Sequence, residues 1–217
     1  MPAKTVTQRR RPTQDRAKAT REHILDTAAR LFGERGIANT STNRIAAEAG
    51  VSIGTVYRYF SDRSVVVEEL LRRLLESVER RLTQRAFVPG DTTTLELITR
   101  ILEVVTAELV DNAKLVRALV AGVQFYNSGI PEFEPRLRLL VKVIVIQILG
   151  PGDDHQYDIA TFVLLNTCFA AVLRASSLEV GPQERQEVLE MTAQMVTAWA
   201  ERERAKDQTL RLWPPEK

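Results

Sequence analysis

The sequence contains very little sulfur and imidazole: one cysteine, Cys168, and two histidines, His23 and His155, among 217 residues. One cysteine excludes a disulfide framework and indicates a reducing compartment, and so few ligands exclude a Cys/His zinc site. A glycine-rich phosphate-binding loop is also missing, and neither histidine has the context of an activated nucleophile. We therefore expect no metal, no cofactor and no enzymatic activity.

Long hydrophobic runs are also absent. No apolar segment follows the basic residues at the N-terminus, which argues against a secretory signal. The longest apolar stretch, residues 162–173, is interrupted by Asn166 and is shorter than the roughly 18 residues that span a bilayer. Because 44% of the residues are hydrophobic and 27% are charged, the composition is that of a folded soluble protein. We expect a cytoplasmic protein with no membrane partner.

Charge is distributed unevenly, although the net charge is only +2. Residues 1–65 carry twelve Lys/Arg against six Asp/Glu, whereas the remaining residues carry 18 against 22. Phosphate neutralisation is the usual reason for concentrating positive charge at one end of a chain. Basic tails also serve only to keep a chain soluble, so the charge alone leaves both interpretations open.

Apolar periodicity predicts helices and no strand. Residues 16–35 repeat apolar side chains at helical spacing and stop at Gly36, which suits the left-handed position after a helix. A long fourth helix is expected to begin after an Asp62 cap and to end before Val88. Proline and glycine separate the later helices. These are expected at about residues 93–111, 113–127, 132–149, 156–179 and 183–205.

Between the first and fourth helices lie two short helices joined at Gly50. The first is capped by Ser41 or Thr42, and the second runs from a Ser52 cap to Phe60. This is the pattern of a helix-turn-helix, whose second helix enters the major groove of DNA. Polar side chains near the start of that helix reach base edges, and hydroxyls and backbone amides hold phosphates.

The segment RIAAEAGVSIGTVYRYF at 44–60, together with FGERG at 32–36 and a basic residue at the start of the fourth helix, resembles the DNA-binding domain of the TetR family of bacterial transcriptional regulators. The resemblance covers about residues 20–70. Beyond residue 90 it extends only to a run of helices of suitable length. It implies an all-α fold: an N-terminal three-helix helix-turn-helix domain and a C-terminal helical bundle for ligand binding and dimerisation.

The resemblance also implies roles for individual residues. Thr42 matches a phosphate-contacting position and Asn43 a position that reaches a base. Tyr59 and Arg63 match flanking phosphate contacts, and Val51, Val56 and Phe60 are expected to face inward. The positions that contact DNA on the third helix are occupied by Ser52, Ile53, Gly54, Thr55, Tyr57 and Arg58.

Three of these roles have alternatives. Ile53 either touches a thymine methyl group or only packs at the turn, and Arg58 either reads a guanine or contacts a phosphate. Tyr57 and Tyr59 are either contacts or partly buried ring stacks. Arg9, Arg10 and Arg11 precede the first helix, which Pro12 is expected to prevent from starting earlier. They lie along phosphates or in a minor groove, or form a solvated tail.

In the body, the resemblance places a dimer interface on the last two helices. The final helix carries an apolar stripe that either pairs with a second copy or is buried within one subunit. Its predicted interface residues are Leu189, Thr192, Met195, Val196 and Trp199.

Polar and aromatic residues within the apolar helices of the body indicate a ligand pocket, because a buried polar group needs a partner. For any one of these residues, internal pairing or surface exposure is the more common outcome, so the pocket is predicted from the group and not from single residues. The predicted pocket residues are Gln124, Phe125, Asn127, Phe162 and Asn166.

The sequence thus predicts a flexible basic arm at 1–15, a helix-turn-helix domain at 16–62, and a ligand-binding and dimerisation domain at 63–217 connected through the fourth helix. The resemblance implies a homodimeric regulator that binds a palindromic double-stranded DNA operator. It further implies a repressor released by a small-molecule effector of hydrophobic or amphipathic character. The alternative is a ligand-independent or non-specific DNA-binding protein.

Overall fold

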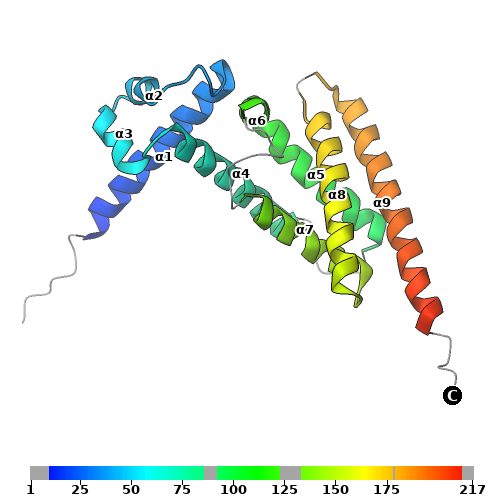
Figure 1. Ribbon diagram of the computed structural model, residues 1–217. Coiled ribbons are helices and arrows are strands. Elements are labelled where there is room, and N and C mark those ends of the chain that lie inside the picture. Colours follow the sequence, from blue (N-terminus) through cyan, green and yellow to red (C-terminus); the bar gives the residue numbers. More distant parts are fainter. Residues whose placement is uncertain (1–9, 86–91, 123–132, 178, 212–217) are drawn as a thin grey trace, which may run out of the picture. The chain divides into compact units, whose positions relative to one another are not determined.

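The computed structural model describes residues 10–85, 92–122, 133–177 and 179–211, which form helices and the turns between them (Figure 1). The all-α fold class is confirmed. Within the described residues the helices are α1 (Arg10–Arg35), α2 (Thr42–Glu48), α3 (Ile53–Tyr59), α4 (Arg63–Arg85), α5 (Thr94–Asp111), α6 (Ala113–Gly122), α7 (Phe133–Leu149), α8 (Asp154–Ala175) and α9 (Pro182–Arg211).

The chain divides into two compact units. Unit 1 consists of residues 1–72 and 114–128 and holds α1, α2, α3, the beginning of α4 and nearly all of α6. Unit 2 consists of residues 73–113 and 129–217 and holds the rest of α4 with α5, α7, α8 and α9. The helix-turn-helix segment therefore shares its unit with α6, which is far from it in the sequence.

Unit 1 has a core to which each of its first three helices contributes. Ile24 and Phe32 of α1, Ile45 of α2, Val56 of α3 and Phe60 at the end of α3 are almost completely buried. Each buried side chain of this size contributes about 1.5–3 kcal/mol. Helices as short as α2 and α3 are not stable alone in water, so this shared core is what maintains them.

The turns of unit 1 follow the sequence signals. Gly36 after α1 has φ +80° and Gly50 after α2 has φ +64°, both in the left-handed region that glycine adopts without strain. Ser41 and Ser52 accept hydrogen bonds from the amides of Arg44 and Thr55 and so cap α2 and α3. The predicted positions of both turns and both caps are confirmed.

Unit 2 contains two apolar clusters. In the first, Val78 and Leu82 of α4 pack with Val104 of α5. In the second, Val145 of α7 packs with Tyr157 of α8, and Trp199 of α9 covers them. The clusters join α4, α5, α7, α8 and α9 into one helical body.

The first helix begins earlier than predicted. α1 starts at Arg10, so Pro12 lies in its first turn and does not prevent the helix from starting. The expectation about Pro12 is wrong, because the first amides of a helix have no partner within the helix and a missing N–H there costs nothing. Arg10 and Arg11 accordingly belong to α1.

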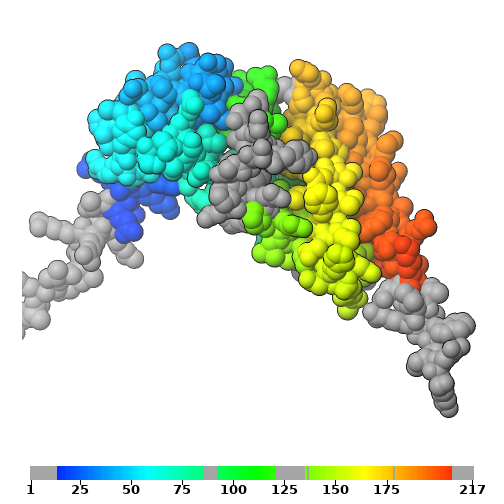
Figure 2. All heavy atoms as spheres, in the orientation of Figure 1, coloured from blue at the N-terminus to red at the C-terminus, as the bar shows by residue number. Residues whose placement is uncertain are grey.

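The helices α8 and α9 lie side by side in unit 2 (Figures 1 and 2) and leave apolar side chains uncovered. By length and composition α8 is long and apolar enough to cross a membrane, a test that core helices of soluble proteins also pass. The search for uninterrupted apolar runs missed this property, because an 18-residue window of α8 has a mean hydropathy of 1.5 although it contains Asn166. We call the exposed residues the outer apolar face: Ile159, Phe162, Val163, Met191 and Met195.

Candidate nucleic-acid interface and C-terminal groove

The buried core of unit 1 fixes which side of α3 faces outward. Val56 is completely buried and Phe60 is 1% exposed, as expected, whereas Val51 is only half-buried. Tyr57, at 52% exposure, and Arg58 point to solvent. The side of α3 opposite the core is therefore exposed to solvent.

We call this surface the reading surface. Its members on α2 are the half-buried Thr42 and the exposed Asn43. On α3 and its cap, the members are exposed or half-buried. They are Ser52, Ile53, Gly54, Thr55, Tyr57 and Arg58.

Hydroxyl groups connect the parts of the reading surface. The Tyr57 hydroxyl lies 3.4 Å from Oγ1 of Thr42 and so joins α3 to the start of α2. The hydroxyls of Ser52 and Thr55 are hydrogen-bonded at 2.8 Å. The structure therefore brings the predicted phosphate-contacting Thr42 next to the predicted base-reading helix.

The two tyrosines of α3 differ in environment. Tyr59 is half-buried, and its ring lies 6.3 Å from the Phe60 ring at an angle of 50°, whereas Tyr57 has no such burial. The interpretation of partly buried ring packing thus fits Tyr59 and not Tyr57.

Arg63, the first residue of α4, lies against the turn between α1 and α2. Its Nη1 donates to the carbonyl oxygens of Ile37 at 3.0 Å, Ala38 at 3.1 Å and Thr40 at 3.5 Å. Asp62 caps the same helix by accepting hydrogen bonds from the backbone amides of Val65 at 3.1 Å and Ser64 at 2.7 Å. These hydrogen bonds lower the pKa of the Asp62 carboxyl group. The sequence pattern contained no signal for the Arg63 contacts, because they join residues 23 to 26 positions apart.

Arg21 of α1 joins the core to α4. Its guanidinium group lies 5.5 Å from the centre of the Phe60 ring and forms an ion pair with Glu69. Glu69 also accepts a hydrogen bond from Nε of Arg72 at 3.1 Å. The hydrogen bonds from Arg72 and Arg21 lower the pKa of the Glu69 carboxyl group, against the opposing effect of its partial burial.

The histidine of α1 also has a structural contact. Nε2 of His23 donates to the carbonyl oxygen of Ala49, 3.1 Å away at the end of α2. Of the three basic residues predicted to contact DNA from the N-terminus, Arg9 lies outside the described residues, and Arg10 and Arg11 lie in the first turn of α1.

The predicted ligand-binding residues are not brought together among the described residues. Gln124, Phe125 and Asn127 lie outside them. Phe162 is 59% exposed, and the amide of Asn166 donates to the Phe162 carbonyl oxygen at 2.7 Å within α8. The Asn166 side chain thus has a partner in its own helix, and Phe162 belongs to the outer apolar face.

The predicted dimer stripe of α9 is divided by the fold. Leu189, at 3% exposure, Thr192 and Val196 are buried within unit 2, and Trp199 is half-buried against the cluster of α7 and α8. Met195, at 61% exposure, faces outward.

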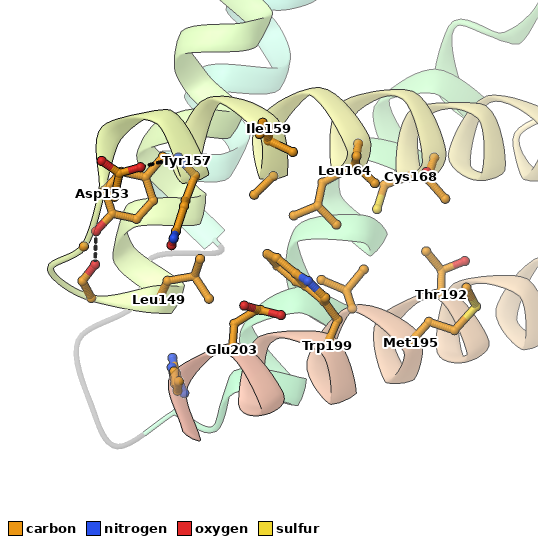
Figure 3. A pocket seen from close by; sticks show the side chains of 18 of the residues that line it. Leu149, Asp153, Tyr157, Ile159, Leu164, Cys168, Thr192, Met195, Trp199 and Glu203 are labelled. Carbon is orange, nitrogen blue, oxygen red and sulfur yellow. Dashed lines mark hydrogen bonds between the residues drawn. The ribbon is translucent and has the colours of Figure 1, made fainter. Parts of the chain in front are cut away.

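A groove with a volume of about 800 Å³ runs between α8 and α9 (Figure 3). Trp199 and Met195 of α9 line one side, and Ile159, Leu164 and Cys168 of α8 line the other. Burial raises the pKa of the Cys168 thiol to about 11, so the thiol is protonated at neutral pH and is a poor nucleophile. The groove was not predicted, because its apolar residues share α8 with the core residues and the sequence does not separate the two sides.

One end of the groove carries polar groups that are hydrogen-bonded to backbone carbonyl oxygens. The Tyr157 hydroxyl donates to the carbonyl oxygen of Gly150, and a Cβ atom on Gly152 would lie only 2.9 Å from that hydroxyl. Arg204 donates to the carbonyl oxygen of Ile148 and, at 2.9 Å, to the hydroxyl of Thr94. Within the described part of the chain, no group of three His, Cys, Asp or Glu side chains is placed to hold a metal ion.

The fold of unit 1 defines a class of protein. Two seven-residue helices joined by a glycine turn, with the second helix exposed on a three-helix core, form a helix-turn-helix DNA-binding domain. Residues 24–70 match the family described as bacterial regulatory proteins, tetR family.

Curated relatives agree with this assignment. The HTH-type transcriptional regulator AcrR of Shigella flexneri is 37% identical over 101 residues, which are 45% of this chain and 47% of that protein. The HTH-type transcriptional regulator SAUSA300_2515 of Staphylococcus aureus (strain USA300) is 33% identical over 117 residues, 52% of this chain and 62% of that protein. The chain thus spans about half to three fifths of the length of these relatives.

Solved structures share the fold across most of the chain. A tetR-family transcriptional regulator from Streptomyces coelicolor superposes with a TM-score of 0.71 at 18% identity, covering 88% of this chain and 85% of that one. A putative TetR-family transcriptional regulator from Syntrophomonas wolfei superposes with a TM-score of 0.68 at 21% identity, covering 84% of this chain and 95% of that one. Residues 24–70 therefore carry a DNA-binding segment of the TetR-family type, and most of the chain shares the fold of solved TetR-family regulators.

Proposed function

We propose that the protein is a homodimeric transcriptional regulator that works in the cytoplasm, binds a palindromic operator and is released from it by a small hydrophobic or amphipathic effector. The observation that carries the proposal is the reading surface, which the buried core of unit 1 holds outward. The family resemblance favours repression over activation as the direction of regulation.

The reading surface assigns contacts by chemistry. Arg58 and Tyr57 are the exposed donors of α3, and they reach base edges or phosphates in the major groove. Ile53 has no polar group and contacts a thymine methyl group. Thr42 lies at the edge of the reading surface, where the Tyr57 hydroxyl orients the Thr42 hydroxyl toward a phosphate.

The outer apolar face supports a dimer. One seven-residue helix reads few bases, and two copies related by a two-fold axis read two half-sites about one helical turn apart. Ile159, Val163 and Met195 of the outer apolar face also line the groove, so a second copy seated there would cover both. A dimer also explains why α8 is apolar enough to resemble a membrane span. We therefore place the interface on Met195 and the rest of the outer apolar face, with Leu189, Thr192 and Val196 supporting it from within.

Helix α4 supports the coupling between effector and operator. It is one continuous helix that belongs to unit 1 up to Arg72 and to unit 2 from Arg73. An effector that displaced it would change the spacing of the two reading surfaces. A coupling free energy of about 1–3 kcal/mol changes operator affinity about 5- to 150-fold, and bound DNA must weaken effector binding by the same factor. The effector pocket remains a prediction, with Gln124, Phe125 and Asn127 as its candidates.

Selection from a pool of random duplexes tests the proposal. The full-length protein is incubated with the pool at physiological salt, and the retained DNA is sequenced. We expect an inverted repeat, and we expect the Arg58→Ala variant to bind it about tenfold or more weakly. The control is Arg35→Ala, which removes the same charge from the exposed last turn of α1.

Three outcomes would each contradict part of the proposal. Binding without an enriched motif that declines smoothly with salt identifies a non-specific DNA-binding protein. Enrichment of a single half-site by a monomer contradicts the dimer. If an inverted repeat is enriched but no small molecule changes the affinity for it, the regulator is ligand-independent.

A further inference from the structure

The contact between Arg63 and the turn preceding α2 has a role that the family resemblance does not assign. The resemblance makes this position a phosphate contact. In the structure, Nη1 of Arg63 donates to the three carbonyl oxygens of Ile37, Ala38 and Thr40. These oxygens lie just after the C-terminal end of α1, where the helix dipole adds negative potential that a cation offsets.

The other polar groups of this turn are already paired. The Thr40 hydroxyl, which is completely buried, donates to the carbonyl oxygen of Gly36 at 2.9 Å, and the Asn39 amide donates to that of Arg35 at 3.1 Å. The Ile37 carbonyl oxygen also accepts from the Thr40 amide at 3.2 Å, so Arg63 adds a second donor there and donates as well to the carbonyl oxygens of Ala38 and Thr40.

The turn determines where α2 begins. Thr40 is followed directly by Ser41, whose hydroxyl and carbonyl oxygens accept the first hydrogen bonds of α2 from the amides of Arg44 and Ile45. Arg63 is itself the first residue of α4. One side chain thus connects the start of α4 to the start of α2, and α2 carries Thr42 and Asn43.

We propose that Arg63 is a positioning residue that holds the α1–α2 turn and the start of α2 against α4, rather than a ligand of a DNA phosphate. The DNA part of this inference rests on the proposed function, whereas the contact itself is a property of the free protein. It would make the position of Thr42 and Asn43 follow any displacement of α4.

The first experiment is hydrogen exchange on the free full-length protein. Arg63→Ala should speed exchange at the amides of Thr40, Arg44 and Ile45 by about tenfold, because local opening of the turn becomes easier. Arg35→Ala, which removes a charge from the neighbouring turn, should leave these rates unchanged. Exchange in Arg63→Ala no faster than in Arg35→Ala overturns the inference, whatever the protein does with DNA.

The second experiment compares two duplexes: the one enriched from the random pool and a scrambled duplex of equal length and composition. A phosphate contact contributes to both alike and to the salt dependence, whereas a positioning residue contributes only to the enriched one. We expect Arg63→Ala to bind the enriched duplex about tenfold or more weakly than the unaltered protein does. On the scrambled duplex its affinity should fall no more than that of Arg35→Ala. Arg63→Lys, which restores a donor and the charge, should recover part of the loss.

A uniform loss on both duplexes, with a salt slope lowered by about one relative to Arg35→Ala, would show that Arg63 is a phosphate ligand. General loss of stability would not change the ratio between the duplexes in folded protein. If no duplex is enriched, the proposed function fails, and the exchange experiment still decides whether Arg63 holds the turn.

Discussion

Gly54 occupies the first turn of α3 on the reading surface, yet the fold of the free protein does not require a glycine there. Its φ is not positive, and a Cβ atom would meet only Oγ of Ser52, at 3.8 Å. We therefore expect Gly54→Ala to raise the free energy of unfolding by up to about 1 kcal/mol, the usual gain of alanine over glycine in a helix. If DNA binds the reading surface as proposed, the same methyl group should also weaken binding to the selected duplex. Thermal unfolding and a DNA titration measure the two effects.

The same substitution at Gly36 is the control, because φ there is +80° and alanine is strained. Gly36→Ala should lower the stability by about 1–2 kcal/mol. A Gly54→Ala variant that is more stable and binds DNA as well as the unaltered protein would show that DNA does not approach this part of α3.

At the scale of single elements, Glu69 links α1 to α4 through its ion pairs with Arg21 and Arg72. Because these partners lower its pKa, the carboxylate contributes stability that is complete above the ordinary glutamate pKa of about 4.3 and is lost as the pH falls through the lowered value. We expect Glu69→Gln to lower the melting temperature at pH 7 by about 3 °C or less. The difference should shrink when the pH falls below about 4.

Thermal unfolding followed by circular dichroism at both pH values is the measurement. Glu68→Gln, on the exposed side of α4, removes the same charge and should have little effect at either pH. If Glu69→Gln lowers the melting temperature equally at pH 7 and at acid pH, the side chain contributes to stability by packing and not by its charge.

The basic segment before α1 is expected to contribute to the salt dependence of DNA binding. Because α1 begins at Arg10, a truncation that tests the basic segment must end at Arg9 and leave the helix intact. Deleting residues 1–9 should lower the slope of log affinity against log salt by about 0.9 for each phosphate contact that is lost. Titrations of the selected duplex at several salt concentrations measure the slope. An unchanged slope would identify these residues as a solvated tail.

The elements differ in how well the sequence predicts them, and the reasons are physical. The caps and turns around α2 and α3 are local, since a serine or a positive-φ glycine acts on residues within four positions, and these were predicted correctly. The helical stripe of α9 was recognised as apolar, but periodicity does not say what covers it. Leu189 packs inside the subunit and Met195 faces outward, a division that depends on where α5, α7 and α8 lie.

The same limit applies to the candidate site. The outward side of α3 follows from Val56 and Phe60, which share one helical face, so the reading surface was predictable from its own segment. The contacts of Arg63 join residues more than twenty positions apart and depend on the tertiary fold. Phe162 was assigned to a ligand pocket because it is aromatic, and only the packing of α8 shows that it lies on the surface.

The outer apolar face is the surface of the molecule on which we expect a partner to bind. Five large apolar side chains that are more than half exposed on two neighbouring helices form a patch of the kind that marks an interaction surface. If the partner is a second copy, a charge placed in the patch must be buried unpaired in the dimer, at a cost of several kcal/mol. We expect Met195→Glu and Phe162→Asp each to shift the protein from dimer to monomer in sedimentation equilibrium.

DNA binding should follow the change in assembly. A dimer places its second reading surface at a high effective concentration over the second half-site, and a monomer loses this advantage. Both variants should therefore bind the inverted repeat about 100-fold or more weakly while their affinity for a single half-site is unchanged. Gln194→Glu, which adds the same charge at an exposed polar position of α9, is the control and should remain dimeric. If the unaltered protein is itself monomeric and binds lipid vesicles, the patch faces a membrane; if it is dimeric with or without these substitutions, the interface lies elsewhere on the molecule.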